Sequence, residues 1–253
     1  MATLILVFLG LVFCGVGGAL LYFSRTTQAK AALIGAVATS GAGTVASRPG
    51  ELVEIKGTLR CQSPLTSELS QSACAYYSAA MTREYEEQER DSDGGWRTVE
   101  RSQTMASNSR GVPFWVEDAT GSVWVRPDGA EVDAWPVLDR FDQSAAGPGI
   151  NVSLGGVAIN FGSGDGRTLG YRYRESILPL DQPVYVLGVV QSNGVVGPPQ
   201  PGRKDQRFII SYRSEEALTQ SFSSSAQWLT YGAIGAFALG AVLILIGLAV
   251  RLF

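Results

Sequence analysis

Two long stretches without a single charged residue occupy the two ends of the chain, residues 2–23 and residues 226–250. Each is longer than the roughly 20 apolar residues that a helix needs to cross the hydrocarbon core of a bilayer. Aromatic residues, which suit the bilayer interface, stand near the inner end of each stretch. These are Tyr22, Phe23, Trp228 and Tyr231. The pattern predicts two transmembrane helices.

The first stretch has an alternative interpretation as a cleaved signal peptide. No basic residue precedes the apolar run, however, and no small-x-small cleavage site follows it closely. We therefore expect residues 2–23 to be an uncleaved anchor.

A period of two dominates the region between the two apolar stretches. Residues 24–49 are small and polar, rich in Gly, Ala and Ser, and predict a juxtamembrane connector. A β-rich domain is then expected over residues 50–225. It opens with VEIKGTLRC, in which apolar and polar residues alternate as in a half-buried strand.

Further strand signals follow along the chain. CAYYSAAMTREYEEQER and WRTVERSQT predict a long hairpin whose turn contains Asp93-Gly94. FWVED, SVWVRP and AEVDAW predict a three-strand meander, whereas residues 141–170 hold eight glycines and predict a long loop. YRYRESILPL, PVYVLGVVQ and RFIISY predict the last strands, and Ser214 is expected to cap a helix that leads into the second apolar stretch.

Many short strands with frequent turn signals favour a mainly β fold (β-rich α+β) with an antiparallel, barrel-like domain between the two helices. VEIKGTL (53–59) and VYVLGVV (184–190) share an apolar-x-apolar-x-Gly-x-apolar pattern. A glycine inside a strand often marks a bend in a small barrel. Two barrel-like halves are one interpretation of this echo, and a generic strand pattern is the other.

Composition excludes several kinds of chemistry. The chain has no histidine and three cysteines, so Ser-His-Asp and Cys-His catalysis, histidine metal sites and a Cys₄ zinc site are not expected. All 23 acidic residues and 19 of the 20 basic ones lie between the apolar stretches, which gives a weak acidic balance and no footprint for nucleic acid. We expect no cofactor, no metal and no catalytic residue that the sequence alone can name.

The carboxylates of the long hairpin are the one candidate for acid–base chemistry. The hairpin also carries Arg83, Arg90 and Arg97, so a solvated face of cross-strand ion pairs is the expected arrangement, and a hydrolase site is the alternative. The carboxylates are Glu84, Glu86, Glu87, Glu89, Asp91 and Asp93.

Two short motifs carry little weight. GSGDG (162–166) lacks the Gly-Lys-Ser/Thr ending of a P-loop and is expected to be a linker. Asn151-Val152-Ser153 fits a glycosylation acceptor, a tripeptide that is common by chance.

Small residues recur at four-residue spacing in both apolar stretches and predict close helix packing. The packing would join the two helices, or copies of the chain in a homo-oligomer. The residues are Gly10, Cys14 and Gly18 in the first stretch and Gly232, Ala236 and Gly240 in the second.

Cys61 and Cys74 lie 13 positions apart in RCQSPLTSELSQSACAYY. With no histidine nearby and Arg60 as the only close cation, a nucleophilic role is not expected. Two alternatives remain for this pair, a disulfide and two structural thiols. Strand alternation argues against the disulfide, because it places Cys74 with Tyr76 on the face opposite Tyr77.

The same stretch carries a family resemblance. A Gly57-centred strand followed by a Pro-Leu turn, two serines, Cys74 and a Tyr-Tyr pair resembles the opening of the GIDE domain, also called the "beside a membrane" (BAM) domain. FWVEDATGSVWVRPDGAEVD, ESILPLDQPVYVLG and RFIISYRSEEAL continue the resemblance over roughly residues 50–225. The motif residues are Pro64, Leu65, Ser67, Ser70, Tyr76, Tyr77, Asp118, Gly121 and Gly188.

In eukaryotic members of this family, the second helix leads into a RING domain, and the protein is a mitochondrial or chloroplast membrane ubiquitin ligase. Here Arg251-Leu252-Phe253 follow the second apolar stretch. The resemblance therefore implies a RING-less, prokaryotic-type relative to which ligase activity does not transfer, although the family association with ubiquitin ligases remains an alternative.

We expect a two-pass membrane protein, in the bacterial plasma membrane, whose domain acts as a juxtamembrane binding, scaffolding or sensing module. Its expected partners are the lipid bilayer and a protein or lipid still to be identified. The termini must share one side of the membrane, but the side of the domain stays open because the intervening segment is too long for the distribution of basic residues to decide.

Overall fold

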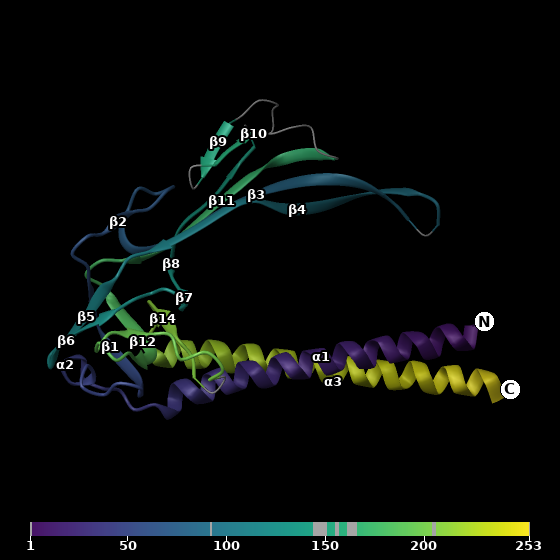
Figure 1. Cartoon of the computed structure of the whole chain (residues 1–253). Coiled ribbons are helices and arrows are strands. Elements are labelled where there is room, and N and C mark those ends of the chain that lie inside the picture. The colour runs from purple at the N-terminus through teal and green to yellow at the C-terminus, as the bar shows by residue number, and fades with distance from the viewer. Residues whose placement is uncertain are drawn as a thin grey trace. The chain divides into compact units, whose positions relative to one another are not determined.

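The computed structural model describes residues 2–91, 93–143, 151–154, 157–160, 166–203 and 206–252 (Figure 1). These residues form two compact units. One contains Met1–Ala38 and Ser214–Phe253, and the other contains Thr39–Arg213. GSGDG lies outside the described residues except for Gly166, and the Asn151 side chain is not described.

The first unit is an antiparallel helix pair, α1 (Ala2–Ala36) and α3 (Glu215–Leu252), with both chain termini at one end of the pair (Figure 1). Both helices are long and apolar enough to cross a membrane. Each continues beyond its apolar stretch, so the segment expected to be a connector is helical through Ala36. The Ser214 hydroxyl accepts a hydrogen bond from the Ala217 N–H at 3.3 Å, which confirms Ser214 as the N-cap of α3.

The contact between the helices follows small residues at seven-residue spacing, the repeat of a left-handed pair. A Cβ added to Gly10 would lie 2.7 Å from the Gly240 carbonyl oxygen, and one added to Gly240 would lie 2.9 Å from Cys14 Sγ. Gly10, Cys14 and Gly240 therefore lie in the contact. The buried small residues of the seam are Gly10, Gly17 and Ser24 in α1 and Ala226, Ala233, Gly240 and Gly247 in α3.

The other three small residues singled out in the sequence lie off this seam. A Cβ on Gly18 would meet nothing within 4 Å, and one on Gly232 would meet only Leu20 Cδ1 at 3.6 Å. Ala236 is partly buried. A four-residue step advances slightly beyond one helical turn, so a contact stays on one face by alternating steps of four and three.

The second unit contains a closed barrel of five strands. Strands β1 and β12 pair antiparallel from Leu52↔Val189 to Thr58↔Pro183 and close the ring. The side chains that the ring strands contribute to the core cluster are Val, Ile and Leu, with Phe114 the one aromatic residue among them. In pairing order the strands are β1 (Leu52–Arg60), β5 (Phe114–Asp118), β6 (Gly121–Val125), β13 (Val196–Gly197) and β12 (Pro183–Val190).

An open, half-barrel sheet makes up most of the rest of this unit. Strand β3 pairs with β4 over almost its whole length, and β11 lies between β3 and β8. The sheet consists of β4 (Trp96–Gly111), β3 (Ala73–Arg90), β11 (Arg167–Pro179) and β8 (Trp135–Asp142), with β2 (Leu65–Thr66) beside β3. The prediction of a mainly β fold with two barrel-like halves is thus confirmed, as is the long hairpin.

The echo between residues 53–59 and 184–190 has a different meaning from the one proposed. The two segments are β1 and β12, neighbours in one barrel, and do not mark equivalent positions in two halves. Their glycines lie near opposite ends of the shared ladder, with Gly57↔Val184 and Val53↔Gly188. The shared pattern therefore marks two neighbouring strands that bend around the same small core.

Two predictions about connections are wrong. Strands β5 and β6 form the expected hairpin, but β7 (Glu131–Asp133) leaves it to pair in parallel with β14 (Ile209–Ser211). Turn signals define where strands end and do not define their partners. The region expected to be a loop over 141–170 contains the end of β8, the pair β9 (Asn151–Leu154) and β10 (Val157–Asn160), and the start of β11. These short glycine-flanked strands carry too few alternating positions to be recognised.

A tight turn carries the chain from the half-barrel into the barrel. Asp181 has a φ of +59°, and its N–H donates to the Leu59 carbonyl at 3.0 Å. The Leu59 N–H donates in return to the Gln182 carbonyl at 2.9 Å. Helix α2 (Ala42–Val45) packs its Ala42 and Val45 into the barrel core.

Candidate functional site

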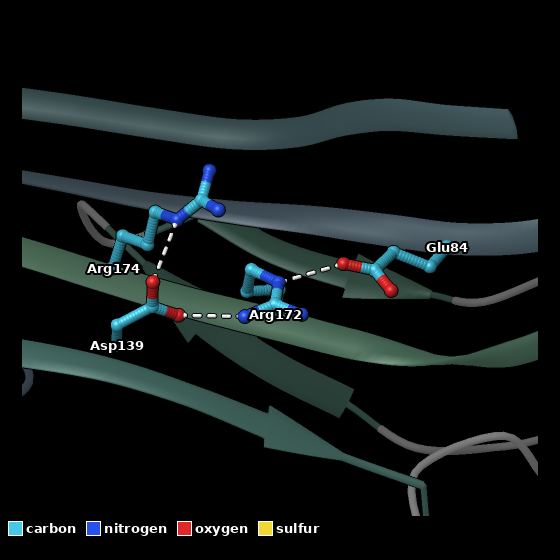
Figure 2. Close-up of polar contacts among 4 residues, drawn as sticks. All are labelled: Glu84, Asp139, Arg172 and Arg174. Carbon is cyan, nitrogen blue, oxygen red and sulfur yellow. Dashed lines mark hydrogen bonds and ion pairs between the residues drawn. The ribbon is translucent and has the colours of Figure 1, made fainter.

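A ladder of ion pairs crosses three strands of the half-barrel (Figure 2). The Arg172 guanidinium of β11 donates through Nε to Glu84 Oε1 of β3 at 2.7 Å, and through Nη1 to Asp139 Oδ1 of β8 at 2.9 Å. Arg174 Nε donates to the other oxygen of Asp139 at 3.2 Å. Two arginines and two carboxylates therefore share their charges across the sheet.

Charge sharing sets the protonation of this ladder. The hydrogen bond from Arg172 holds the pKa of Asp139 below its usual value, and the hydrogen bond from Arg174 has a smaller effect in the same direction. Glu84 and then Asp139 raise the pKa of Arg172. A general acid needs the opposite arrangement, a carboxyl whose pKa is raised by burial or by another carboxylate. The pKa of Asp139 is shifted in the opposite direction, and the ladder connects the side chains of β3, β11 and β8.

Three other hairpin carboxylates also pair with arginines. Glu87 and Glu89 both meet Arg101 across the hairpin, at 2.8 and 3.3 Å, and Glu86 meets Arg167 at 3.7 Å. Among the described residues, no group of three or more Cys, Asp or Glu side chains could hold a metal ion. The described part of the hairpin thus shows an arginine-paired face. Glu86 and Glu87 also line a pocket of about 600 Å³, together with Arg167.

Glu175 is a fully buried carboxylate on β11, only 1% exposed. Its oxygens accept hydrogen bonds from the backbone N–H groups of Leu69 and Ser70, both at 2.7 Å, and from Ser67 Oγ at 3.0 Å. Burial alone would raise the pKa of Glu175, but the hydrogen bonds from Ser70, Leu69 and Ser67 outweigh burial and lower it. The motif serines therefore fix the 61–72 loop to the half-barrel.

Glu68, from the same loop, makes a second attachment. Its Oε1 accepts hydrogen bonds from Tyr77 OH at 3.0 Å and from Asn108 Nδ2 at 2.5 Å. Burial, and then the Glu68 carboxylate, raise the pKa of the Tyr77 hydroxyl, which stays protonated and donates. Leu65 and Leu69 cover the buried face beside these polar contacts.

Asp118 organises the turn between β5 and β6. It accepts hydrogen bonds from the Thr120 N–H and hydroxyl and, at 2.8 Å, from the Ala42 N–H. Burial would raise the pKa of Asp118, but these hydrogen bonds lower it overall. Gly121 has a φ of +139°, and a Cβ there would lie 3.0 Å from Gly43 Cα. These two motif residues hold the 41–45 segment against the turn.

Cys61 and Cys74 are free thiols in the structure. Each lies near a backbone carbonyl, Cys61 Sγ at 3.8 Å from Pro113 O and Cys74 Sγ at 3.8 Å from Leu65 O. Burial, the charge of Glu175 and the Cys61 thiol raise the pKa of Cys74 to about 11. A thiol with so high a pKa is a poor nucleophile near neutral pH.

The prediction of the sheet face on which Cys74 lies is wrong, because β3 contains a β-bulge. Leu178 pairs with Tyr76 and Pro179 with Cys74, so Ala75 is one extra residue on β3. The bulge turns Cys74 onto the face of Tyr77 and Ala79, with which it is buried, while Ala75 joins the barrel core.

The remaining motif residues have structural positions. Pro64 immediately precedes β2, which begins at Leu65. A Cβ on Gly188 would lie 2.8 Å from both Phe208 Cδ2 and Val196 Cγ1, so only glycine fits between these side chains. Tyr76 lines a pocket.

That pocket was not predicted from the sequence. It has a volume of about 230 Å³ and lies between the end of β4 and the turn that follows β6. Its polar lining contains an arginine and an aspartate separated by 18 positions in the chain, a juxtaposition without local sequence signal. The lining residues are Tyr76, Ser109, Arg110, Gly111, Pro127, Asp128, Gly129 and Ala130.

Aromatic side chains form a second surface feature that the sequence did not predict. Trp115 and Trp124 are paired residues of β5 and β6, with ring centroids 5.1 Å apart. Trp124 is 45% exposed on the outside of the barrel. The alternation of β6 could have indicated this, because Val123 and Val125 take the core positions.

Together these features define a β-barrel protein flanked by two helices capable of crossing a membrane. The family model GIDE, described as E3 ubiquitin ligase, matches residues 82–245. The match covers more than half of the chain, and the chain belongs to the GIDE family. It begins within β3, so the 60–77 stretch lies before it, whereas Asp118, Gly121 and Gly188 lie inside it. No curated protein and no solved structure matches the chain.

Proposed function

We propose that this chain is a membrane-anchored binding module that recruits a protein partner through the outer strand of its half-barrel, β4. The observation that carries this proposal is the exposure of β4. None of its 16 residues is buried, and among the described residues it pairs with β3 alone. An outer strand of this length offers backbone N–H and C=O groups to an added strand.

The sequence of β4 supports strand addition. Proteins usually protect an exposed edge with charges, proline or bulges. Residues 102–109, SQTMASNS, contain no charged residue and no proline. A bulge at Met105, where Met81 pairs with Ala106 and Thr82 with Thr104, is the one protective feature of this part. The edge therefore suits a partner strand with polar side chains.

The helix pair supports membrane anchoring. Ser24 Oγ donates to the Ala226 carbonyl at 3.0 Å and lies 2.7 Å from Thr230 Oγ1, so these residues lie at one level of the pair. At that level four aromatic side chains are more than half exposed, as suits a bilayer interface. They are Tyr22, Phe23, Trp228 and Tyr231. The proposal places both apolar stretches across the plasma membrane of a bacterial cell.

Site-specific photocrosslinking in native membranes tests the binding role. A photoreactive residue is introduced at Ser102, Thr104 or Ser107 of β4 in the full chain, with Ser122 and Asn193, both exposed elsewhere, as matched controls. The proposal expects one discrete protein adduct of the same mass at the β4 positions and none at the controls. It fails if β4 gives no adduct or if the controls give the same one.

Thiol accessibility decides which side of the membrane the β unit faces, and carbonate extraction tests the anchoring. Cys61 is partly exposed. A membrane-impermeant maleimide reacts with it in intact cells only if the β unit faces outward, and after permeabilisation in either case. Extraction of the chain by carbonate without detergent would contradict membrane insertion.

A role in ubiquitin ligation is the second candidate, favoured by the description of the family. A RING module binds zinc through cysteine and histidine, and these 253 residues hold three cysteines and no histidine. The β unit would therefore serve such a reaction by presenting a substrate. In that case the β4 adduct would be ubiquitinated in cells with a ubiquitin system, and loss of the β4 contact would abolish the modification.

A further inference from the structure

We propose that Glu100 selects the partner of β4, and that the added strand carries a lysine or an arginine directly opposite this carboxylate. The inference rests on the proposed binding role of β4 and names the chemistry that would distinguish its partner from other extended segments.

Glu100 lies in the open strand and faces another carboxylate. It is exposed, and in the β3–β4 ladder it pairs directly with Glu86. Like charges directly opposite one another in a sheet destabilise the strand pair. Arg167 lies 3.7 Å from Glu86 and its side chain is 81% exposed, so this ion pair offsets the repulsion only weakly. Glu100 itself forms no ion pair with any residue that the structure describes.

The arginines in this part of β4 are paired on the opposite face of the sheet. Arg101 contacts Glu87 at 2.8 Å and Glu89 at 3.3 Å, and Arg97 lies 3.9 Å from Glu89. Because side chains alternate between the two faces along a strand, Arg97 and Arg101 lie on one face and Glu100 lies on the other. Glu100 is therefore the charge of this segment that an added strand is left to neutralise.

A small pocket lies beside Glu100 and has a volume of about 180 Å³. Its lining residues are Glu84, Glu100, Arg101, Ser102 and Leu169. Glu84 pairs directly with Ser102, so both lie on the face of Glu100. Arg172 already binds Glu84 at 2.7 Å (Figure 2), which leaves Glu100 as the open carboxylate of the pocket. Leu169 suits the aliphatic stem of a long cationic side chain.

Strand addition brings a partner side chain to this position. A residue directly opposite Glu100 on an added strand lies on the same face, with the two Cβ atoms about 4.5–5.5 Å apart. Lysine and arginine side chains span this distance. The uncharged run 102–109 begins two positions away, so one segment pairs with that run and also meets Glu100. Backbone hydrogen bonds then supply affinity, whereas the charge excludes segments with an acidic residue at this position.

Charge reversal tests the inference in the full chain in native membranes. With the photoreactive residue kept at Ser107, Glu100→Lys should lower the yield of the partner adduct about fivefold, because it replaces an attractive pair with a repulsive one. Glu100→Gln should give an intermediate yield. Asp93→Lys makes the same change of net charge at an exposed position in the turn of the same hairpin and should leave the yield unchanged.

Two measurements separate selection of the partner from loss of structure. In thermal unfolding, Glu100→Lys should be at least as stable as wild type, because it removes the repulsion from Glu86. In wild type, a photoreactive residue at Ser102 should form its adduct with a partner segment that carries a lysine or an arginine within two residues of the crosslinked position. Mass spectrometry of the adduct identifies that segment.

The inference is overturned if Glu100→Lys keeps the wild-type yield, if Asp93→Lys lowers the yield equally, if Glu100→Lys lowers the unfolding temperature, or if the crosslinked segment has no basic residue near the adduct. In each of these cases a wild-type adduct on β4 preserves the binding role, and only the assignment of Glu100 fails. A wild-type chain without any β4 adduct would overturn both.

Discussion

The barrel and the half-barrel solve the problem of a stable sheet in different ways. The barrel closes on itself through β1 and β12, and its interior is aliphatic around Phe114. The half-barrel stays open along β4. Its covering loop is fixed by three hydrogen bonds to the buried Glu175 carboxylate, from Ser67, Leu69 and Ser70, and by a hydrogen bond from Tyr77 to Glu68. Closure removes edges, whereas the open sheet keeps two, β4 and β8.

This difference indicates where stability and function lie. Burial of apolar surface in a closed ring is non-directional and tolerates little loss of volume. Polar attachment is directional, and it holds the 61–72 loop in one position while leaving the outer strand available. The barrel is therefore the stable base of the unit, and the half-barrel is the part through which we propose that a partner binds.

The largest expected effect is at the centre of the barrel. Phe114→Ala removes a fully buried ring and should lower the free energy of unfolding by about 3–5 kcal/mol. Thermal unfolding of the full chain in detergent, followed by tryptophan fluorescence, measures the change. Trp124→Ala on the outside of the same hairpin is the control and should cost less than about 1 kcal/mol. Equal losses would show that the interior of the barrel does not dominate the free energy of unfolding.

The second effect tests the polar attachment of the half-barrel. Glu175→Gln leaves N–H donors without a charged acceptor and should lower stability by about 2 kcal/mol at pH 7. Because the folded pKa of Glu175 lies below its unfolded value of about 4.3, its contribution is complete above that pH and is lost as the pH falls through the folded pKa. Wild type should therefore lose more stability than the variant between pH 5 and 2, as pH-dependent denaturation measures. Parallel curves would contradict this role.

The third effect concerns the thiol beneath the loop. With a pKa of about 11, Cys74 is ionised to only about one part in a thousand at pH 8, and it is fully buried. In a Cys14→Ala background, maleimide should modify Cys61 at least about tenfold faster than Cys74. Glu175→Gln should accelerate the Cys74 reaction alone, because it loosens the loop and removes a charge that raises the pKa of Cys74. Mass spectrometry of the two peptides gives both rates, and an unchanged Cys74 rate would mean that Glu175 does not hold the loop.

The smallest effect belongs to the ion-pair ladder of Figure 2. Arg172→Gln removes a half-buried pair with Glu84 and an exposed pair with Asp139, and should shift the unfolding temperature only slightly at low salt. The shift should vanish in 1 M salt, where screening removes such pairs. A double-mutant cycle with Asp139→Asn measures the coupling. A shift that persists at high salt would show that the ladder contributes by packing and not by charge.

Local pattern was enough to predict many elements. Alternation in VEIKGTLRC gave β1, and Asp93-Gly94 between two charged strands gave the β3–β4 hairpin. Ser214 gave the start of α3. In each case the signal and the structure involve residues close together in the chain, so propensity and turn chemistry suffice.

Long-range features did not follow from pattern. The bulge at Ala75 depends on the register between β3 and β11, about 100 residues apart, and it reversed the face assigned to Cys74. The parallel pairing of β7 with β14 and the antiparallel pairing of β1 with β12 depend on a core that assembles from the whole unit. Turn residues cannot encode such choices.

By itself, the sequence determined two apolar helices, a β-rich domain between them and membership of the GIDE family, because each is expressed in local composition or in short motifs. Only the tertiary structure decided which strands close a ring, that Ser67 and Ser70 hold Glu175, and that Arg110 and Asp128 share a pocket. The physical reason is that these arrangements minimise free energy over contacts between distant residues, and no single segment contains them.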